Sequence, residues 1–171
     1  NHRSIFSAIY IKPASVNGLR TIVYLQQSFK KMVYVSRKEH FNAAHKLYNP
    51  AWSREKNIEV FGPCANENWH GHNFDMTVTV KGNVDPATGF VVNFKDLNKI
   101  IKMHVLDKVD HKNLNMDVDF MKGKLTSCEN LLLEFWHILQ PEISSMSDGR
   151  ATLHCIKLKE TNKNYAEYYG E

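Results

Sequence analysis

The 171-residue sequence lacks the marks of a membrane or disulfide-stabilised protein. It contains no stretch approaching the roughly 20 apolar residues that a membrane-spanning helix needs. Its three cysteines, at positions 64, 128 and 155, are too few and odd in number for a disulfide framework in a chain of this length. We therefore expect free thiols, a cytoplasmic location and no association with membranes.

Acidic residues are absent from the first 31 positions. Five basic residues give this segment a charge of +5, whereas the other 140 residues hold 17 basic and 18 acidic groups and carry −1. We interpret residues 1–31 as a basic N-terminal extension outside the catalytic domain, with Met32 as the natural start. Mitochondrial targeting by residues 1–31 is the alternative that their acid-free composition leaves open. Residues 32–171 are expected to form one domain.

The slightly acidic domain also lacks the interleaved basic and aromatic stripe of a nucleic-acid-binding surface. We therefore expect no nucleic-acid partner. A small metal-stabilised binding module, whose basic leader meets nucleic acid or a membrane, is the non-enzymatic alternative raised by the pI of 8.9.

Hydrophobic periodicity predicts an α+β fold in which two helices cover one face of an antiparallel four-stranded sheet. Strands are expected at about residues 33–47, 74–80, 90–92 and 151–159. Residues 74–80 alternate strictly, and the turn formers at 85–89 predict a hairpin to the strand at 90–92. Residues 51–68 are expected to be a long loop with one helical turn.

Two segments have helical periodicity. The first begins near Lys95 behind a cap at Asn93. The second begins with Thr126 and Glu129 as a capping box, and Pro141 is expected to end it.

The strongest local signal is His70-Gly71-His72, which leads directly into the alternating strand. Residues two apart in a strand point to the same side, so both imidazoles can bind one ion. They are in phase with the apolar positions of the strand, which places them at the end of its buried face. His45 supplies a third ligand if the preceding strand pairs alongside, and three nitrogen ligands with one open position are typical of catalytic zinc. The alternative is a set of ordinary strand-end and core histidines.

Three further positions in the sequence offer side chains for proton transfer or hydrogen bonding. A thiol at Cys64, close to a metal and to imidazoles, is expected to have a lowered pKa and to act as a base or nucleophile. In the pair Asp110 and His111, the carboxylate can fix the imidazole tautomer and raise its basicity. Glu160 can hydrogen-bond the amide and amine edge of a heterocycle. Each has a structural alternative. Cys64 can be a small buried thiol, the Asp110-His111 pair a turn at the end of a helix, and Glu160 a solvated acid at the end of a strand.

Taken together, these residues resemble the 6-pyruvoyl-tetrahydropterin synthase family, and the resemblance extends from about Met32 to Glu171. Five segments that match the family's motifs occur in the same order: residues 41–47, 61–73, 85–89, 110–114 and 159–161.

The resemblance implies a zinc-dependent lyase of tetrahydrobiopterin biosynthesis. Such an enzyme converts 7,8-dihydroneopterin triphosphate to 6-pyruvoyl-tetrahydropterin with elimination of triphosphate, so the expected partner is a small pterin triphosphate. Family members have the T-fold, whose trimers close into a barrel and stack as a homohexamer with active sites between subunits. That assembly covers the sheet edges that a lone domain leaves open.

The resemblance also assigns roles to individual residues. Three histidines are implied as zinc ligands, namely His45, His70 and His72. Cys64 is implied as the proton-abstracting thiolate, with Asp110 and His111 as a proton relay. Glu160 is implied to anchor the pterin ring, with Glu129 as a further pterin contact.

A second branch of the same fold family shares the cysteine, the histidines and the Asp-His pair. This branch is 6-carboxy-tetrahydropterin synthase of queuosine biosynthesis. The five residues between Cys64 and His70, and the long segment 51–60, favour the pyruvoyl branch, because the carboxy branch usually has a shorter gap.

Overall fold

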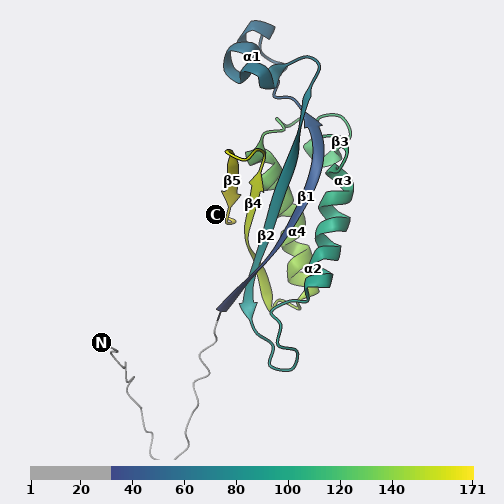
Figure 1. The fold of residues 1–171 in the computed structure, drawn as a ribbon, viewed down its shortest axis with the longest axis vertical. Helices are drawn as coiled ribbons and strands as arrows, with labels where there is room; N and C mark the ends of the chain where they lie inside the picture. The colour runs from purple at the N-terminus through teal and green to yellow at the C-terminus, as the bar shows by residue number, and fades with distance from the viewer. Residues whose placement is uncertain (1–31) are drawn as a thin grey trace, which may run out of the picture.

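The computed structural model describes residues 32–171, in which helices cover one face of a five-stranded sheet (Figure 1). The strand order is β3-β1-β2-β4-β5. Residues 1–31, and with them the predicted extension, lie outside the described residues. Among residues 32–171, none of the helices combines the length and the apolar character that a membrane span requires.

Two long strands form the centre of the sheet. β1 (Met32–His45) and β2 (His70–Asn83) pair antiparallel along their whole length, and β4 (Ala151–Lys159) pairs antiparallel with the other edge of β2. The short β5 (Tyr165–Tyr168) follows beside β4, and β3 (Lys112–Asn113) runs parallel to β1. The predicted α+β class is confirmed. The sheet nevertheless has mixed orientation, and two of its five strands, β3 and β5, were not predicted. Strands of two and four residues are too short to show a clear periodicity in the sequence.

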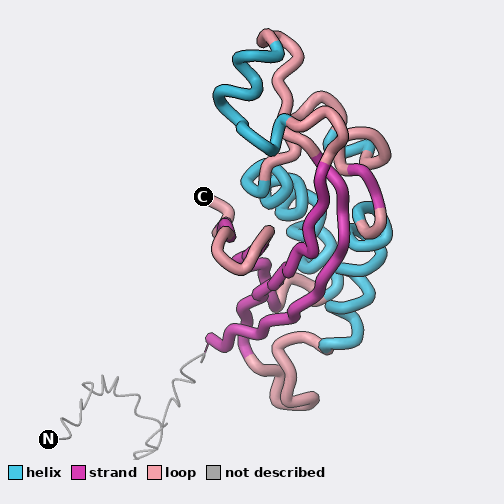
Figure 2. The backbone as a smooth tube through the Cα atoms, turned by 45° about the horizontal axis from the view of Figure 1, so that its top comes forward, coloured by secondary structure: helices cyan, strands magenta, loops and turns pink. Residues whose placement is uncertain are grey.

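The helices fall into two groups. α2 (Phe94–Ile101) and α4 (Cys128–Met146) lie against the sheet, whereas α1 (Arg54–Phe61) projects beyond its end (Figure 1, Figure 2). α2 continues through the π turn η2 (Lys102–Leu106) into α3 (Asp107–Val109). Two 3-10 turns complete the fold, η1 (Gly62–Ala65) after α1 and η3 (Asp119–Met121) before α4. The segment predicted as a loop with a helical turn thus contains a complete helix.

The core lies between the sheet and the helices. Phe41 and Phe74 are fully buried and stack at 4.8 Å between ring centroids, and Phe135 of α4 meets Phe41 edge-on at 6.0 Å. Alternate residues of β2 from Phe74 to Val80 face this core, as the periodicity predicts. Because this burial fixes the register of β2, His70 and His72 also lie on the core-facing side.

The predicted strand at residues 90–92 is wrong. Val91 and Val92 are buried as predicted, but they lie in a loop. β2 already pairs with β1 on one edge and β4 on the other, so no edge remains for a returning hairpin strand. Val91 instead packs against Gly82, where a Cβ atom would lie 2.8 Å from the Val91 Cγ1 atom.

The predicted end of the second helix at Pro141 is also wrong, since α4 continues to Met146. Proline removes one helical hydrogen bond. Beyond it, however, Ile143 is fully buried in the core, and the Ser147 hydroxyl bonds the Ile143 carbonyl at 3.0 Å. Burial of the last turn therefore outweighs the missing hydrogen bond.

The start of α4 differs from the predicted capping box. Ser127, and not Thr126, is the N-cap, and its hydroxyl accepts a hydrogen bond from the Asn130 amide at 3.3 Å. The Thr126 hydroxyl is buried and donates to the Lys46 carbonyl at 3.2 Å. Glu129 lies in the first turn without a capping role, which frees its carboxylate for other contacts.

Removing the true cap should destabilise the protein. We expect Ser127→Ala to lower the free energy of unfolding by about 1 kcal/mol, because an orphan amide of the first turn loses its acceptor. Glu129→Ala should change it by less than about 0.5 kcal/mol, as is usual for an exposed side chain. Urea unfolding of both variants tests this, and an equal loss in Glu129→Ala would restore the capping box.

Candidate metal centre and active site

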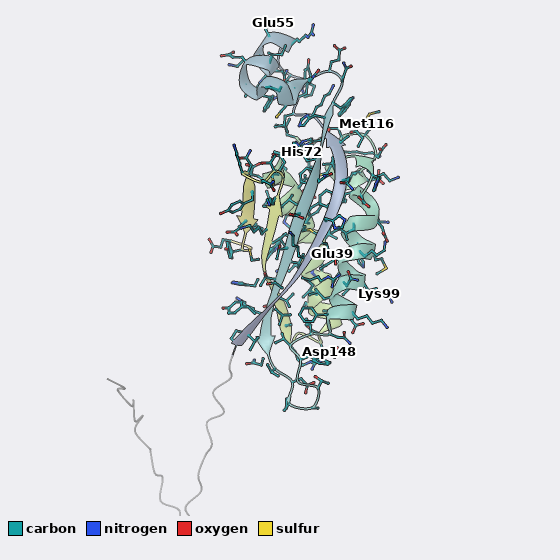
Figure 3. The ribbon with its side chains drawn as sticks, in the orientation of Figure 1. Glu39, Glu55, His72, Lys99, Met116 and Asp148 are labelled. Atoms are coloured by element: carbon teal, nitrogen blue, oxygen red, sulfur yellow. The ribbon has the colours of Figure 1, made fainter. Side chains whose placement is uncertain are left out.

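Three histidines meet where the paired ends of β1 and β2 lie side by side. His45 is the direct partner of His70 in the ladder, and His72 follows two residues later on the same face. One ring nitrogen from each histidine lies within 4.8 Å of the other two. The pairing of β1 with β2, on which the predicted three-histidine group depends, is therefore present. His72 lies at the end of the sheet toward α1 (Figure 3).

The surroundings of this histidine group orient His45. Its Nδ1 atom lies 2.8 Å from the Thr126 carbonyl, and this contact fixes Nδ1 as the protonated nitrogen and leaves the Nε2 lone pair free. Phe74 packs edge-on against His45 and His72, with centroid distances of 5.9 and 5.6 Å. The Thr126 carbonyl and the Phe74 ring therefore hold the His45 imidazole in place, and Phe74 also packs against His72.

The unpaired nitrogens of the group fit a bound cation. His45 Nε2 and both ring nitrogens of His70 are buried and have no hydrogen-bond partner among the described residues. Buried polar atoms without partners are costly and need an explanation. Burial lowers the pKa of His45 to about 4 and also lowers that of His70, so both rings are neutral near pH 7, the form that binds metals. The histidine group can therefore hold a metal ion.

Glu160 lies beside the histidine group, immediately after β4. Its Oε1 atom is 3.5 Å from His45 Nε2 and 3.7 Å from His72 Nε2. Burial first, and then the charges of Glu160 and Glu129, raise the pKa of the Cys128 thiol to about 12. Both predicted substrate-binding carboxylates therefore lie close enough to Cys128, at the start of α4, to act on its thiol, and Glu160 also contacts the histidine group.

Cys64 is brought to the site by η1. Its carbonyl accepts a hydrogen bond from the Leu47 amide at 2.9 Å, which attaches η1 two residues beyond His45. Burial raises the pKa of the Cys64 thiol, and the negative charge of Glu160 raises it further. The predicted lowering of this pKa is thus not produced by the protein's own groups, and a nearby cation is needed for it.

A buried asparagine that the sequence analysis missed supports this part of the site. Asn57 of α1 has no exposed surface, and its side chain accepts from the Asn49 amide at 2.6 Å and donates to the Asn49 and Ser53 carbonyls at 2.9 Å. Asn57 thereby fixes α1, and with it η1, against the segment that leaves β1. A lone asparagine in a polar segment gives no sequence signal for such a role.

Asp110 and His111 form a second candidate catalytic pair, beside the outer edge of β1. Asp110 Oδ1 accepts from the Asn42 amide at 2.8 Å and lies 3.0 Å from His111 Nδ1. The His111 amide donates to the Asn42 carbonyl at 2.6 Å. His111 has a φ of 57°, a left-handed conformation that costs energy for a side-chain-bearing residue and is often found at functional sites.

These contacts hold an exposed imidazole in one orientation beside a carboxylate. The Asn42 amide and then His111 lower the pKa of Asp110, so the carboxylate is charged near neutral pH. No hydrogen bond within residues 32–171 joins Cys64 to Asp110 or His111. The structure therefore brings the histidines, Glu160 and Cys64 to one end of the sheet and presents Asp110 and His111 at its edge.

Comparison with known proteins gives consistent matches. A family model described as 6-pyruvoyl tetrahydropterin synthase matches residues 34–171. A curated protein from Pongo abelii named 6-pyruvoyl tetrahydrobiopterin synthase is 41% identical over 137 residues, which cover 80% of this chain and 91% of that protein. The solved structure of Caenorhabditis elegans 6-pyruvoyl tetrahydropterin synthase is 36% identical, with a TM-score of 0.74, and the match covers 82% of this chain and 97% of that one.

The predicted alternative has a more distant counterpart. A protein of Bacillus subtilis (strain 168) named 6-carboxy-5,6,7,8-tetrahydropterin synthase is 24% identical over 149 residues, covering 85% of this chain and 91% of that protein. The chain is therefore more similar to proteins named for the pyruvoyl product.

Proposed function

Because the chain belongs to the 6-pyruvoyl tetrahydropterin synthase family, we propose that it is a zinc-dependent lyase that converts 7,8-dihydroneopterin triphosphate to 6-pyruvoyl-tetrahydropterin and inorganic triphosphate. The observation that carries the proposal is the group of three histidines, His45, His70 and His72, with Glu160 beside it. The chain that holds this group is 41% identical to a protein named 6-pyruvoyl tetrahydrobiopterin synthase. Identity to the carboxy-pterin relative is much lower, and no contact in the site favours that second reaction.

The histidine group is the proposed zinc site. Its three nitrogen donors match the ligand set of a catalytic zinc with an open position. Zinc held there supplies a Lewis acid that polarises a substrate oxygen and acidifies the neighbouring C–H bond. The Thr126 carbonyl keeps His45 in the tautomer that such binding needs.

Two carboxylates are the proposed pterin contacts. Glu160 accepts hydrogen bonds from the amide and amine edge of the ring, which sets the distance between the ring and the histidine group. Glu129 adds a further contact from the first turn of α4. Since Glu160 lies within 4 Å of two ligand histidines, a pterin bound to it has its side chain next to the metal site.

Cys64 is the proposed base. As a thiolate it takes the proton from the side-chain carbon, and Asp110 and His111 relay protons between the substrate and solvent. During the reaction the side chain loses electrons and the pterin ring gains them, so no external oxidant is required. The C–O bond to triphosphate breaks with its electron pair on the departing oxygen.

The proposal includes a homohexamer built from two trimeric barrels, with active sites between subunits. Within the described chain, β3 pairs only with residues 43–44 of β1, and β5 pairs on one side only, so most of both sheet edges is open. Joining these edges between subunits would close a barrel. It would also let Asp110 and His111 at one edge serve a Cys64 outside their own chain. The proposed compartment is the cytoplasm, in accord with three free thiols.

Release of inorganic triphosphate tests this function. The purified, zinc-loaded protein should release one triphosphate for each 7,8-dihydroneopterin triphosphate consumed, as measured by ion chromatography. Consumption without triphosphate, or no consumption at all, would contradict the proposal.

Asp110→Asn should reduce turnover more than stability. An asparagine oxygen can still accept from the Asn42 amide, but it cannot stabilise a protonated His111. We expect kcat to fall by about 100-fold or more, the usual contribution of a proton-transfer pair, with the free energy of unfolding changed by less than about 1 kcal/mol. Asp148→Asn, at an exposed position near the opposite end of the sheet, is the control (Figure 3). A kcat equal to that of the control would remove Asp110 from the relay.

A further inference from the structure

The side-chain amide of Asn115 holds the backbone of Lys46, the residue that follows the proposed ligand His45. Its Oδ1 atom accepts a hydrogen bond from the Lys46 amide at 3.1 Å, and its Nδ2 atom donates to the Lys46 carbonyl at 3.0 Å. A backbone amide can only donate and a carbonyl can only accept, so these two contacts fix which end of the Asn115 amide carries the oxygen. The side chain is thereby held in one orientation.

These contacts extend the pairing of β1 past the end of β3. β3 itself pairs with residues 43–44 of β1, and its chain then enters a hydrogen-bonded turn at residues 113–117. Backbone pairing with β3 therefore stops before His45. Beyond it, the Asn115 side chain supplies to Lys46 the acceptor and the donor that a further strand residue would supply. The chain on the far side of His45 is thus held as firmly as the chain before it.

The same amide contacts Thr126, whose carbonyl orients His45. The hydroxyl of the buried Thr126 lies 3.1 Å from Asn115 Oδ1 as well as 3.2 Å from the Lys46 carbonyl, so its proton is shared between the two oxygens. The Thr126 carbonyl accepts from His45 Nδ1 at 2.8 Å. Asn115 therefore joins the two segments that determine where the His45 ring lies, namely the end of β1 and the residue before the N-cap of α4.

We propose that Asn115 is a positioning residue for the metal site, and that it acts by holding Lys46 and Thr126 so that the His45 ring keeps its place. The inference rests on the proposed function for the identity of the metal. Within residues 32–171, Asn115 makes no hydrogen bond to the three histidines, so it acts on the site only through these neighbours. Groups that orient metal ligands in this way typically change metal affinity by about 10–100-fold.

Zinc affinity tests this role without pterin chemistry. In competition with a chromophoric chelator, the full chain with Asn115→Ala should bind zinc about tenfold or more weakly than the wild type. Asn115→Asp should stay within about fivefold of the wild type. Its carboxylate still accepts from the Lys46 amide and the Thr126 hydroxyl, and only one neutral hydrogen bond, the donation to the Lys46 carbonyl, is lost.

Asn93→Ala is the matched control. Asn93 is the N-cap of α2, its side chain accepts from the Lys95 amide at 2.9 Å, and α2 begins near the end of the sheet opposite α1 (Figure 1). Losing this cap destabilises the fold without touching the histidine group, so the zinc affinity should equal that of the wild type. Cobalt(II) bound in place of zinc gives a second measurement, because its visible absorption depends on the arrangement of its ligands. Asn115→Ala should change this spectrum, and Asn93→Ala should not.

Turnover of 7,8-dihydroneopterin triphosphate separates this inference from the proposed function. Weaker zinc binding by Asn115→Ala, in a protein that does not turn over the pterin, would support the role of Asn115 and overturn the proposed function. If Asn115→Ala does not fold, Thr126→Val takes its place: valine loses only the hydroxyl and keeps the carbonyl, and zinc affinity should fall by about threefold or more. Wild-type zinc affinity in the variant tested, or an equal loss in Asn93→Ala, would overturn the positioning role even if the protein is a synthase.

Discussion

Replacing Cys64 with alanine should abolish turnover, by about 10³-fold or more, while zinc stays bound. Cys64 is the group proposed to take the substrate proton, whereas the proposed zinc ligands are all histidines on β1 and β2. Alanine removes the base and leaves η1 attached to the strand, because that attachment runs through the Cys64 carbonyl and not its side chain. Zinc content by mass spectrometry and kcat on the same sample provide the measurement.

Cys155→Ala is the control for Cys64→Ala. Cys155 is buried in β4, away from the proposed substrate contacts, and should retain kcat within about twofold. If Cys64→Ala keeps full activity, the base is another group. If it loses zinc together with activity, Cys64 supports the metal site and its assignment as the base fails.

Replacing His70 with alanine should remove the metal. The wild type should bind about one zinc per chain, as a three-histidine site implies, and His70→Ala should bind less than about one tenth of that. Both nitrogens of the His70 ring are buried and have no hydrogen-bond partner within residues 32–171, and alanine leaves only two of the three histidine donors. Turnover should fall with the zinc content.

The same variant should lose the stabilisation that zinc provides. A ligand present at 100 times its Kd stabilises the folded protein by about 2.7 kcal/mol. Added zinc should therefore raise the Tm of the wild type and leave that of His70→Ala unchanged. His104→Ala, at a π-turn histidine 3.7 Å from Glu142, is the control that should keep the wild-type response. Full zinc content in His70→Ala would show that the ion binds elsewhere.

The histidine group was predictable from the sequence for a simple physical reason. Strand residues alternate between two faces, so the apolar series from Phe74 to Val80 places His70 and His72 on the core side at the end of β2. Only the pairing partner of β2 was uncertain, and the observed ladder brings His45 directly opposite His70. The periodicity of β2 and its pairing with β1 were therefore sufficient to predict the three-histidine group.

Other parts of the site depend on backbone groups that carry no sequence signal. The Thr126 carbonyl orients His45 across 81 positions of sequence, and the Asn42 backbone holds Asp110 and His111. Any residue has such carbonyl and amide groups, so the residue type reveals nothing. The direction of the Cys64 pKa also depends on burial and on Glu160, which only the folded chain defines.

The errors in the predicted secondary structure also arise from interactions that local sequence does not define. Residues 90–92 have the composition of a strand, but the competition for the edges of β2 was decided by β4, about 60 residues later. Pro141 disfavours a helix locally, whereas burial of Ile143 favours its continuation. In each case a distant packing partner decided between local alternatives.

The mass of the pterin product distinguishes the proposed pyruvoyl reaction from the carboxy reaction most directly. Zinc-loaded protein is incubated with 7,8-dihydroneopterin triphosphate without oxygen, and the pterin products are analysed by mass spectrometry. Our account predicts a tetrahydropterin that retains its three-carbon side chain as a diketone, together with free triphosphate. Release of acetaldehyde with a carboxylated pterin would contradict it.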